Sequence, residues 1–260
     1  PAGDIREQRY TIQALLLGMA GRLPSQRREV SCWRDGEFGD RLEHLWGLAG
    51  ISSGMSEWNW RFFRVRPANF PTRRLAAASY LLTRYWSCGM LGGILRLLDE
   101  ASSRAKCRNL ENWFAVVADD YWAEHSDFGL GGVRSPTLVG QGRAREVVVN
   151  VVLPFFFAWA DAYSQHLKKE ILELYEIYPR LSQNWITCRM SEQLAGEKAW
   201  SIENSAQRQQ GLLHLYHAFC VDRKCGECPL GRAFGWSISV SAGWGILIFG
   251  YKFTVETASQ

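Results

Sequence analysis

The run VVVNVVLPFFFAWA, residues 147–160, is the most apolar stretch of the chain. It is 14 residues long and is interrupted by Asn150 and Pro154, so it is shorter than the ~20 residues that a bilayer-spanning helix needs. A helix that is apolar on all sides is typical of the interior of a globular protein. We therefore expect residues 147–159 to form the most buried helix of a helical core, and we expect no membrane association.

Apolar residues recur at helical spacing on both sides of this run. Asn69 is a good N-cap and Pro71 is tolerated in a first turn, so a helix is expected to begin there. The glycine-rich residues 129–142 predict a loop. The expected helices cover residues 7–23, 38–48, 71–89, 91–102, 110–125, 145–166, 168–178, 182–195 and 202–219.

The C-terminal segment has a different period. A period of two, broken by Ser-Ala-Gly at 241–243, predicts a β-hairpin. The fold class that follows is mainly α: a multi-helix, bundle-like domain over residues 1–231, with a short β-like tail over residues 232–260. The alternating apolar residues of the tail are Trp236, Ile238, Val240, Trp244, Ile246, Ile248, Tyr251, Phe253 and Val255.

Composition and charge place the chain among ordinary soluble globular proteins, with 47% hydrophobic and 22% charged residues in 260. Residues 1–110 hold 17 Lys and Arg against 10 Asp and Glu, a net charge of +7, and residues 111–200 hold 8 against 12, a net charge of −4. Seven cysteines, an odd number, suit a reducing compartment and a metal site better than a disulfide framework. We therefore expect a cytoplasmic protein.

The densest chemical signal is a cluster of potential metal ligands within fifteen residues, at His214, His217, Cys220, Cys225 and Cys228. Thiolate and imidazole are the ligands that zinc prefers, and the two-residue gap in Cys225-Gly-Glu-Cys228 lets both sulfurs reach one ion. His217, Cys220, Cys225 and Cys228 would complete a tetrahedral structural zinc site. The alternative is a set of thiols that bind no metal.

The same segment, CVDRKCGECPL at residues 220–230, resembles the iron–sulfur loop of the endonuclease III group of DNA glycosylases. Its first gap is four residues instead of six, and no fourth cysteine follows. The resemblance leaves zinc and an iron–sulfur cluster both open as cofactors. A cluster would need Cys188 or a histidine as its fourth ligand.

Residues 57–74, EWNWRFFRVRPANFPTRR, combine arginines with aromatic residues. Arginine binds phosphate through a planar fork of donors, and aromatic rings stack on bases. This pattern predicts a nucleic-acid interface, whereas the competing interpretation pairs the arginines with the acidic second half of the chain. The candidate residues are Arg61, Arg64, Arg66, Arg73, Arg74, Trp58 and Trp60.

Acidic residues gather between Asp119 and Asp127, where Asp120 and Glu124 would lie one turn apart on the expected helix. Such a group can build a metal or acid–base site, and it offers a hydrolase as one functional hypothesis. A solvated acidic helix face is the competing interpretation. No phosphate loop, dinucleotide fingerprint or serine–histidine–acid signature is present in the sequence.

Four phrases occur together in order: LLLGMAG at residues 15–21, RPANFPTR at 66–73, NVVLPF at 150–155, and QGLLH at 210–214 leading into the cysteines. In this the chain resembles the bacterial family called domain of unknown function 2851, over residues from about 10 to 231. The resemblance implies no established activity. It implies that members are longer at the N-terminus, with a β-rich half that would hold the catalytic carboxylates and would be absent here.

The sequence therefore favours a helical, metal-stapled accessory region of a larger cytoplasmic protein. Its expected partners are nucleic acid and the missing N-terminal half. A structural or protein-interaction module is one alternative, and a hydrolase that uses residues 119–127 is another.

Overall fold

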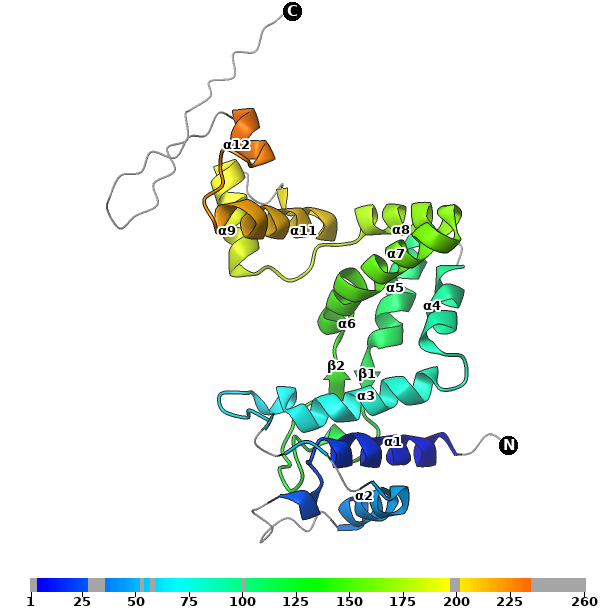
Figure 1. The fold of residues 1–260 in the computed structure, drawn as a ribbon. Coiled ribbons are helices and arrows are strands. Elements are labelled where there is room, and N and C mark those ends of the chain that lie inside the picture. The colour runs from blue at the N-terminus through cyan, green and yellow to red at the C-terminus, as the bar shows by residue number, and fades with distance from the viewer. Residues whose placement is uncertain are drawn as a thin grey trace, which may run out of the picture. The chain divides into compact units, whose positions relative to one another are not determined.

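The computed structural model describes residues 4–27, 36–51, 54–56, 59–99, 102–196 and 202–234 (Figure 1). The chain divides into two compact units, residues 1–174 and 175–260. The expected division near residue 231 stays untested, and the predicted C-terminal hairpin lies outside the described residues.

Three helices form one end of the first unit: α1 (Ile5–Met19), α2 (Gly36–Ala49) and α3 (Pro71–Tyr85). Helix α1 begins at Asp4, whose carboxylate accepts a hydrogen bond from the amide of Arg6 at 3.0 Å, as an N-cap residue does. Helix α1 packs against both α2 and α3 (Figure 1). The contact is apolar because Leu17, Leu42 and Ala76 are fully buried.

The chain then forms α4 (Met90–Leu98), α5 (Ser103–Phe114) and two short antiparallel strands, β1 (Val116–Val117) and β2 (Thr137–Val139). The expected helix over residues 110–125 is therefore wrong beyond Phe114. Val116 pairs with Val139, far along the sequence, and this pairing overrides the local helical pattern. The mainly α fold with a small β element is confirmed.

One continuous helix of 23 residues follows, Gln141–Tyr163. It consists of α6 (Gln141–Val147), a π-helical segment (Val148–Val152) and α7 (Leu153–Tyr163). Pro154 has no amide hydrogen to donate to the preceding turn. The wider π-helical turn lies directly before it, which lets the helix continue through the proline.

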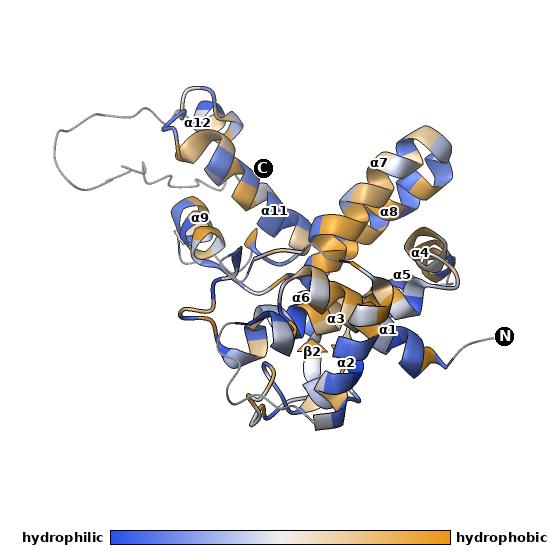
Figure 2. Cartoon of the chain, turned by 60° about the horizontal axis from the view of Figure 1, so that its bottom comes forward, coloured by the Kyte–Doolittle hydropathy of each residue, from blue (hydrophilic) through white to orange (hydrophobic). Residues whose placement is uncertain are grey.

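The expectation that this helix is the most buried element is wrong. Only 33% of its most apolar 18-residue window is buried, and Val151 and Phe155 are 59% and 55% exposed. One stripe, with Val148, Phe156 and Ala160, packs inward. Figure 2 shows that hydrophobic residues nevertheless dominate α7. By length and composition alone the helix could cross a membrane, a criterion that core helices of soluble proteins also meet.

Helix α8 (Gln165–Ile177) leads from the first unit into the second. The second unit holds α9 (Trp185–Ala195), α11 (Ala206–Leu215), a π-helical segment (Tyr216–Cys220) and α12 (Pro229–Phe234). Its buried centre combines apolar residues such as Tyr178, Met190 and Leu212 with polar ones. The buried carboxylate of Glu203 accepts hydrogen bonds from Gln183 at 2.6 Å and Gln209 at 2.8 Å, so this acid is held by amide groups.

Arg73 links α3 to the segment that carries β1 and β2. Its side chain is 1% exposed, and its two terminal nitrogens donate to four backbone carbonyls: those of Trp122 and His125 at 2.7 and 2.8 Å, and those of Ser135 and Thr137 at 3.1 Å. A planar guanidinium has the donors for such a pattern. Arg73 is therefore a core residue whose terminal donors are bound to the backbone, so it has almost no exposed surface for the predicted contact with nucleic acid.

We predict that Arg73→Met lowers the free energy of unfolding by at least ~3 kcal/mol, because four buried or partly buried hydrogen bonds lose their charged donor. Urea denaturation measures the change. Arg66→Met is the matched control: Arg66 is exposed, so its replacement should cost less than ~0.5 kcal/mol. Equal stability of the two variants would contradict this role for Arg73.

Candidate functional site

The arginine–aromatic loop, residues 59–70, is held against the end of α1 by its aromatic residues. The indole nitrogen of Trp60 donates to the carbonyl oxygen of Ala20 at 2.7 Å. The ring of Phe62 meets the ring of Phe70 edge-on at 5.1 Å, and the guanidinium of Arg22 lies 4.5 Å from the centre of the Phe62 ring. These contacts fix the base of the loop on the first unit.

The tip of the loop is a tight turn, Phe62–Val65. The carbonyl of Phe62 accepts a hydrogen bond from the amide of Val65 at 3.1 Å. Arg64, the third residue of the turn, has a φ of 60°. Phe63 beside it is 82% exposed, and the Arg64 guanidinium lies 5.1 Å from the centre of its ring. The tip therefore presents an aromatic face and a cation together.

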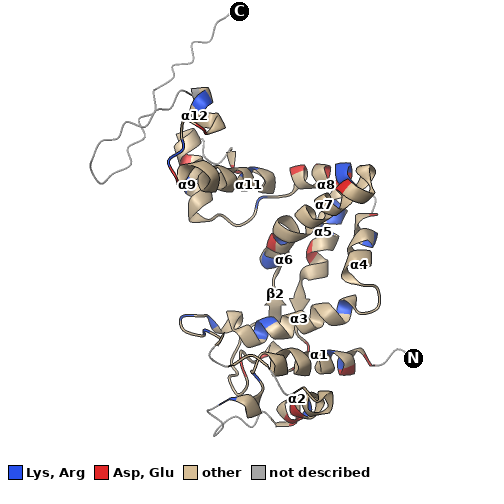
Figure 3. Cartoon of the chain, viewed as in Figure 1, with Lys and Arg blue, Asp and Glu red and all other residues tan. Residues whose placement is uncertain are grey.

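Three arginines of the loop, Arg61, Arg64 and Arg66, are exposed. None of the ion pairs within the part of the chain that the structure describes involves them. Figure 3 shows cationic residues on this loop and on the first turn of α3. The loop is thus a positively charged surface whose donors remain available to an anion.

Arg74 adds a half-exposed cation at the start of α3. Its side chain donates to the amide oxygen of Asn69 at 2.7 Å. Burial, and then the positive charge of Arg143 at the start of α6, lower the pKa of the Arg74 guanidinium below its ordinary value. Arg143 itself pairs with Glu146 at 2.6 Å. Two like charges held close together favour a bound anion.

The structure thus brings together four of the seven predicted nucleic-acid-binding residues, Arg61, Arg64, Arg66 and Arg74. Trp60 is half-buried and anchors the loop instead of facing solvent. Trp58 lies outside the described residues. The sequence pattern does not distinguish Phe63 from the other aromatic residues of the segment, and Arg143 is distant from the segment in sequence.

The acidic residues 119–127 lie in a loop with one short turn, Tyr121–Ala123, and not on a helix. The Asp120 carboxylate accepts from Gln13 at 2.9 Å and lies 4.0 Å from Arg9. Asp127 is buried and pairs with Arg22 at 3.2 Å and Arg27 at 2.5 Å. These contacts attach the loop to α1 and the segment after it.

Asp119 makes a further contact with α1, an ion pair with Arg9. Burial acts to raise its pKa, but a hydrogen bond from Tyr80 at 2.7 Å and an ion pair with Arg9 at 2.9 Å outweigh it, so its pKa lies below the ordinary value. A carboxylate bound in this way stays ionised and accepts no proton near neutral pH. Structural ion pairs therefore explain this cluster better than acid–base catalysis.

The cysteine segment forms a compact turn in the second unit. The amides of Glu227 and Cys228 donate to the carbonyl of Lys224 at 3.2 and 3.0 Å. A side chain at Gly231 would collide with the carbonyl oxygen of Cys225, so only glycine permits this close approach. Burial, followed by the charges of Cys228 and Cys225, raises the pKa of the Cys220 thiol. The other two thiols therefore contribute to the electrostatics at Cys220.

The other predicted metal ligands do not converge on the thiols. His217 is exposed, and the sulfur of Cys220 lies 3.9 Å from that of Met190. Among the described residues, no group of three or more His, Cys, Asp or Glu side chains is arranged to hold a metal ion. The four-ligand zinc or iron–sulfur site therefore stays a prediction.

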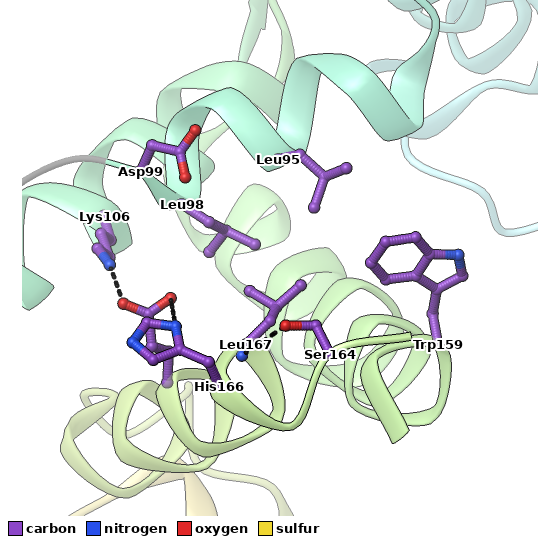
Figure 4. A pocket seen from close by; sticks show the side chains of 9 residues that line it. Leu95, Leu98, Asp99, Lys106, Trp159, Ser164, His166 and Leu167 are labelled. Carbon is purple, nitrogen blue, oxygen red and sulfur yellow. Dashed lines mark hydrogen bonds and ion pairs between the residues drawn. The ribbon is translucent and has the colours of Figure 1, made fainter. Parts of the chain in front are cut away.

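A pocket of about 440 Å³ lies in the first unit between α4, α5, α7 and α8 (Figure 4). Leu98, Trp159 and Leu167 give it an apolar wall. Lys106 pairs with Glu170 at 3.1 Å, and His166 lies 3.9 Å from the same carboxylate. Because these charged groups bind one another across the rim, the pocket is a weaker candidate than the arginine–aromatic loop.

Comparison with known proteins adds one match. Residues 3–184 match a protein family described as "Protein of unknown function (DUF2851)", which is well over half of the 260 residues. The match includes the arginine–aromatic loop and ends before the cysteine segment, whereas the resemblance in the sequence analysis extended to about residue 231. Neither the curated proteins nor the solved structures give a match.

If the cysteines bind metal, Cys225→Ser should release it and lower the free energy of unfolding by on the order of several kcal/mol, because metal binding is coupled to folding. Elemental analysis and a visible spectrum of protein purified without oxygen measure the metal. Cys88→Ser, a change at a half-buried thiol in the first unit, is the control and should leave the metal bound. Metal-free protein with an unchanged melting temperature would rule out the staple.

Proposed function

Because the chain belongs to the DUF2851 family, whose description assigns no activity, we propose its function from the geometry of its own surface. The arginine–aromatic loop, together with Arg74 and Arg143, binds the phosphate backbone of nucleic acid. On this proposal the chain is an accessory region of a cytoplasmic protein, and its partner in catalysis is the N-terminal half that the resemblance implies.

The observation that carries this proposal is the gathering of arginines on one loop, where Arg61, Arg64 and Arg66 form no ion pair within the described residues. Arg61, Arg64 and Arg66 are exposed on one loop, and the charges of Arg74 and Arg143 oppose each other beside it. Assembling like charges costs free energy, which a polyanion recovers on binding. Arginine suits this role because its fork of donors matches two phosphate oxygens.

In the competing interpretation, arginines neutralise the acidic half of the chain. The arginines that do so are not those of the arginine–aromatic loop. Arg9, Arg22 and Arg27 pair with Asp119, Asp120 or Asp127. These pairs account for part of the excess positive charge of the first 110 residues. Since the loop arginines take no part in them, internal pairing supplies no reason for their presence.

We predict that Arg64→Ala combined with Arg66→Ala flattens the salt dependence of duplex DNA binding by about two units of slope, because each arginine removes roughly one phosphate contact. Fluorescence anisotropy with a labelled oligonucleotide, between about 50 and 200 mM salt, measures the slope.

The control variant is Arg104→Ala combined with Arg108→Ala on α5. These two arginines are also exposed, and the variant loses the same net charge. Its slope should stay close to that of the unchanged protein. Equal slopes for both double variants would place the contact elsewhere, and no salt-sensitive binding to DNA or RNA at micromolar concentration would end the nucleic-acid proposal.

A second candidate function, a protein-interaction module, is favoured by the exposed apolar face of the helix Gln141–Tyr163. Val151 and Phe155 face solvent together with the small residues Ala158 and Ala162, which permit close approach of another helix. Burying such side chains yields roughly 25 cal/mol for each Å² removed from water. The face is therefore costly unless a partner covers it.

A second copy of this chain is the partner that fits the charges at the two ends of the face. Arg143 and Glu146 lie at one end, and Asp161 and Lys168 form an ion pair at 2.5 Å near the other. Antiparallel pairing about a twofold axis sets each end beside the opposite end of the second copy. Arg143 then approaches Asp161, and Glu146 approaches Lys168, so each end meets opposite charges.

We predict a concentration-dependent dimer that Phe155→Glu dissociates, since a carboxylate at the centre of an apolar contact loses its hydration. Sedimentation velocity measures the mass. Leu48→Glu is the matched control, because Leu48 on α2 is 71% exposed and lies outside this face. A monomer at all concentrations, or equal dissociation by both variants, would reject self-association through α7.

A further inference from the structure

We infer that Phe63 and Arg64 form a stacking site for one unpaired base, so that the loop prefers single-stranded over double-stranded nucleic acid. The inference rests on the proposed nucleic-acid function and assigns it a substrate class. It concerns the tip of the loop, whereas the phosphate contacts come from the arginines around it.

The exposure of Phe63 is the first observation. Its neighbour Phe62 packs against Phe70 and beneath the Arg22 guanidinium, but Phe63 leaves 82% of its surface in water. A single exposed aromatic is common on soluble proteins, so the exposure shows only that the face of this ring is available for stacking. The charges around this ring, Arg61, Arg64 and Arg66, favour an anionic ligand over an apolar protein surface.

The second observation is the backbone of Arg64. It occupies the third position of a turn closed by the Phe62 carbonyl and the Val65 amide, with a φ of 60°. Glycine fits this position best and asparagine tolerates it, because a Cβ atom is strained at positive φ. The Arg64 guanidinium lies 5.1 Å from the centre of the Phe63 ring. The turn itself would favour glycine, so the arginine at this position is explained if its guanidinium serves in binding.

A base fits the chemistry of this tip. Every base has a π face that stacks on an aromatic ring, and a guanidinium plane extends the same platform through cation–π attraction. The phosphates on either side of the base would then reach Arg61 and Arg66. In a duplex, neighbouring base pairs cover both faces of each base, so a protruding Phe63 finds no partner there. The tip therefore discriminates by strandedness and not by sequence.

The test uses the full chain with a fluorescently labelled oligothymidylate and with a blunt duplex of equal length, both at one salt concentration. Phe63→Ala should weaken single-strand binding roughly five- to a hundredfold, the range for loss of one stacked base, and should change duplex binding by less than about twofold. Phe63→Tyr, which keeps an aromatic face, should restore the single-strand affinity.

Arg64→Gly separates binding from folding. Glycine relieves the strain of the positive φ, so its melting temperature should equal or exceed that of the unchanged protein. Its affinity for the single strand should fall nonetheless. Equal weakening of single-strand and duplex binding by Phe63→Ala would overturn the stacking site and leave the phosphate interface intact, whereas absence of binding to either probe would overturn both.

Discussion

The first unit depends on the burial of Arg73. Its guanidinium joins the start of α3 to the carbonyls of residues 122, 125, 135 and 137, which lie before and within β2. Carbonyl groups of an irregular segment would be costly to bury without donors. One cation supplies those donors from a single point, so the loop that carries the acidic residues packs beside α3 with few strand hydrogen bonds of its own. Substitution by lysine would not reproduce the geometry, since an ammonium lacks the planar fork.

The carboxylates of the acidic loop, residues 119–127, form ion pairs with arginines of α1 and of the segment after it. Arg9, Arg22 and Arg27 meet the carboxylates of Asp119, Asp120 and Asp127, so the acidic loop is neutralised by α1 and the residues after it. Arg61, Arg64 and Arg66 are exposed, and among the residues that the structure describes they form no ion pair that would offset their charge.

The sequence predicted the mainly α fold and most helices, because helical periodicity is a local signal. The sequence-based prediction failed where contacts between residues distant in sequence determine the local structure or the burial of a side chain. The helix expected over residues 110–125 yields to the pairing of Val116 with Val139, and Arg73 could not be told from Arg66 by type or spacing. The candidate site was predicted as a segment, but which of its aromatics anchors and which protrudes follows from tertiary packing of Trp60, Phe62 and Phe63.

The residues covered by the family match indicate which surfaces of the chain lie in the region that family members share. Residues 3–184 include the arginine–aromatic loop and the exposed helix Gln141–Tyr163, and they exclude every cysteine of the cluster. The second unit has its own buried centre around Glu203, Gln209 and Leu212. The first unit likewise buries Leu17, Trp122 and Phe156 among its own elements. The cysteine turn lies in the second unit and outside the matched region. The matched region covers the first unit and the first residues of the second, and among the described residues of the first unit folding alone does not explain the loop arginines that form no ion pair or the exposed apolar face of the helix Gln141–Tyr163.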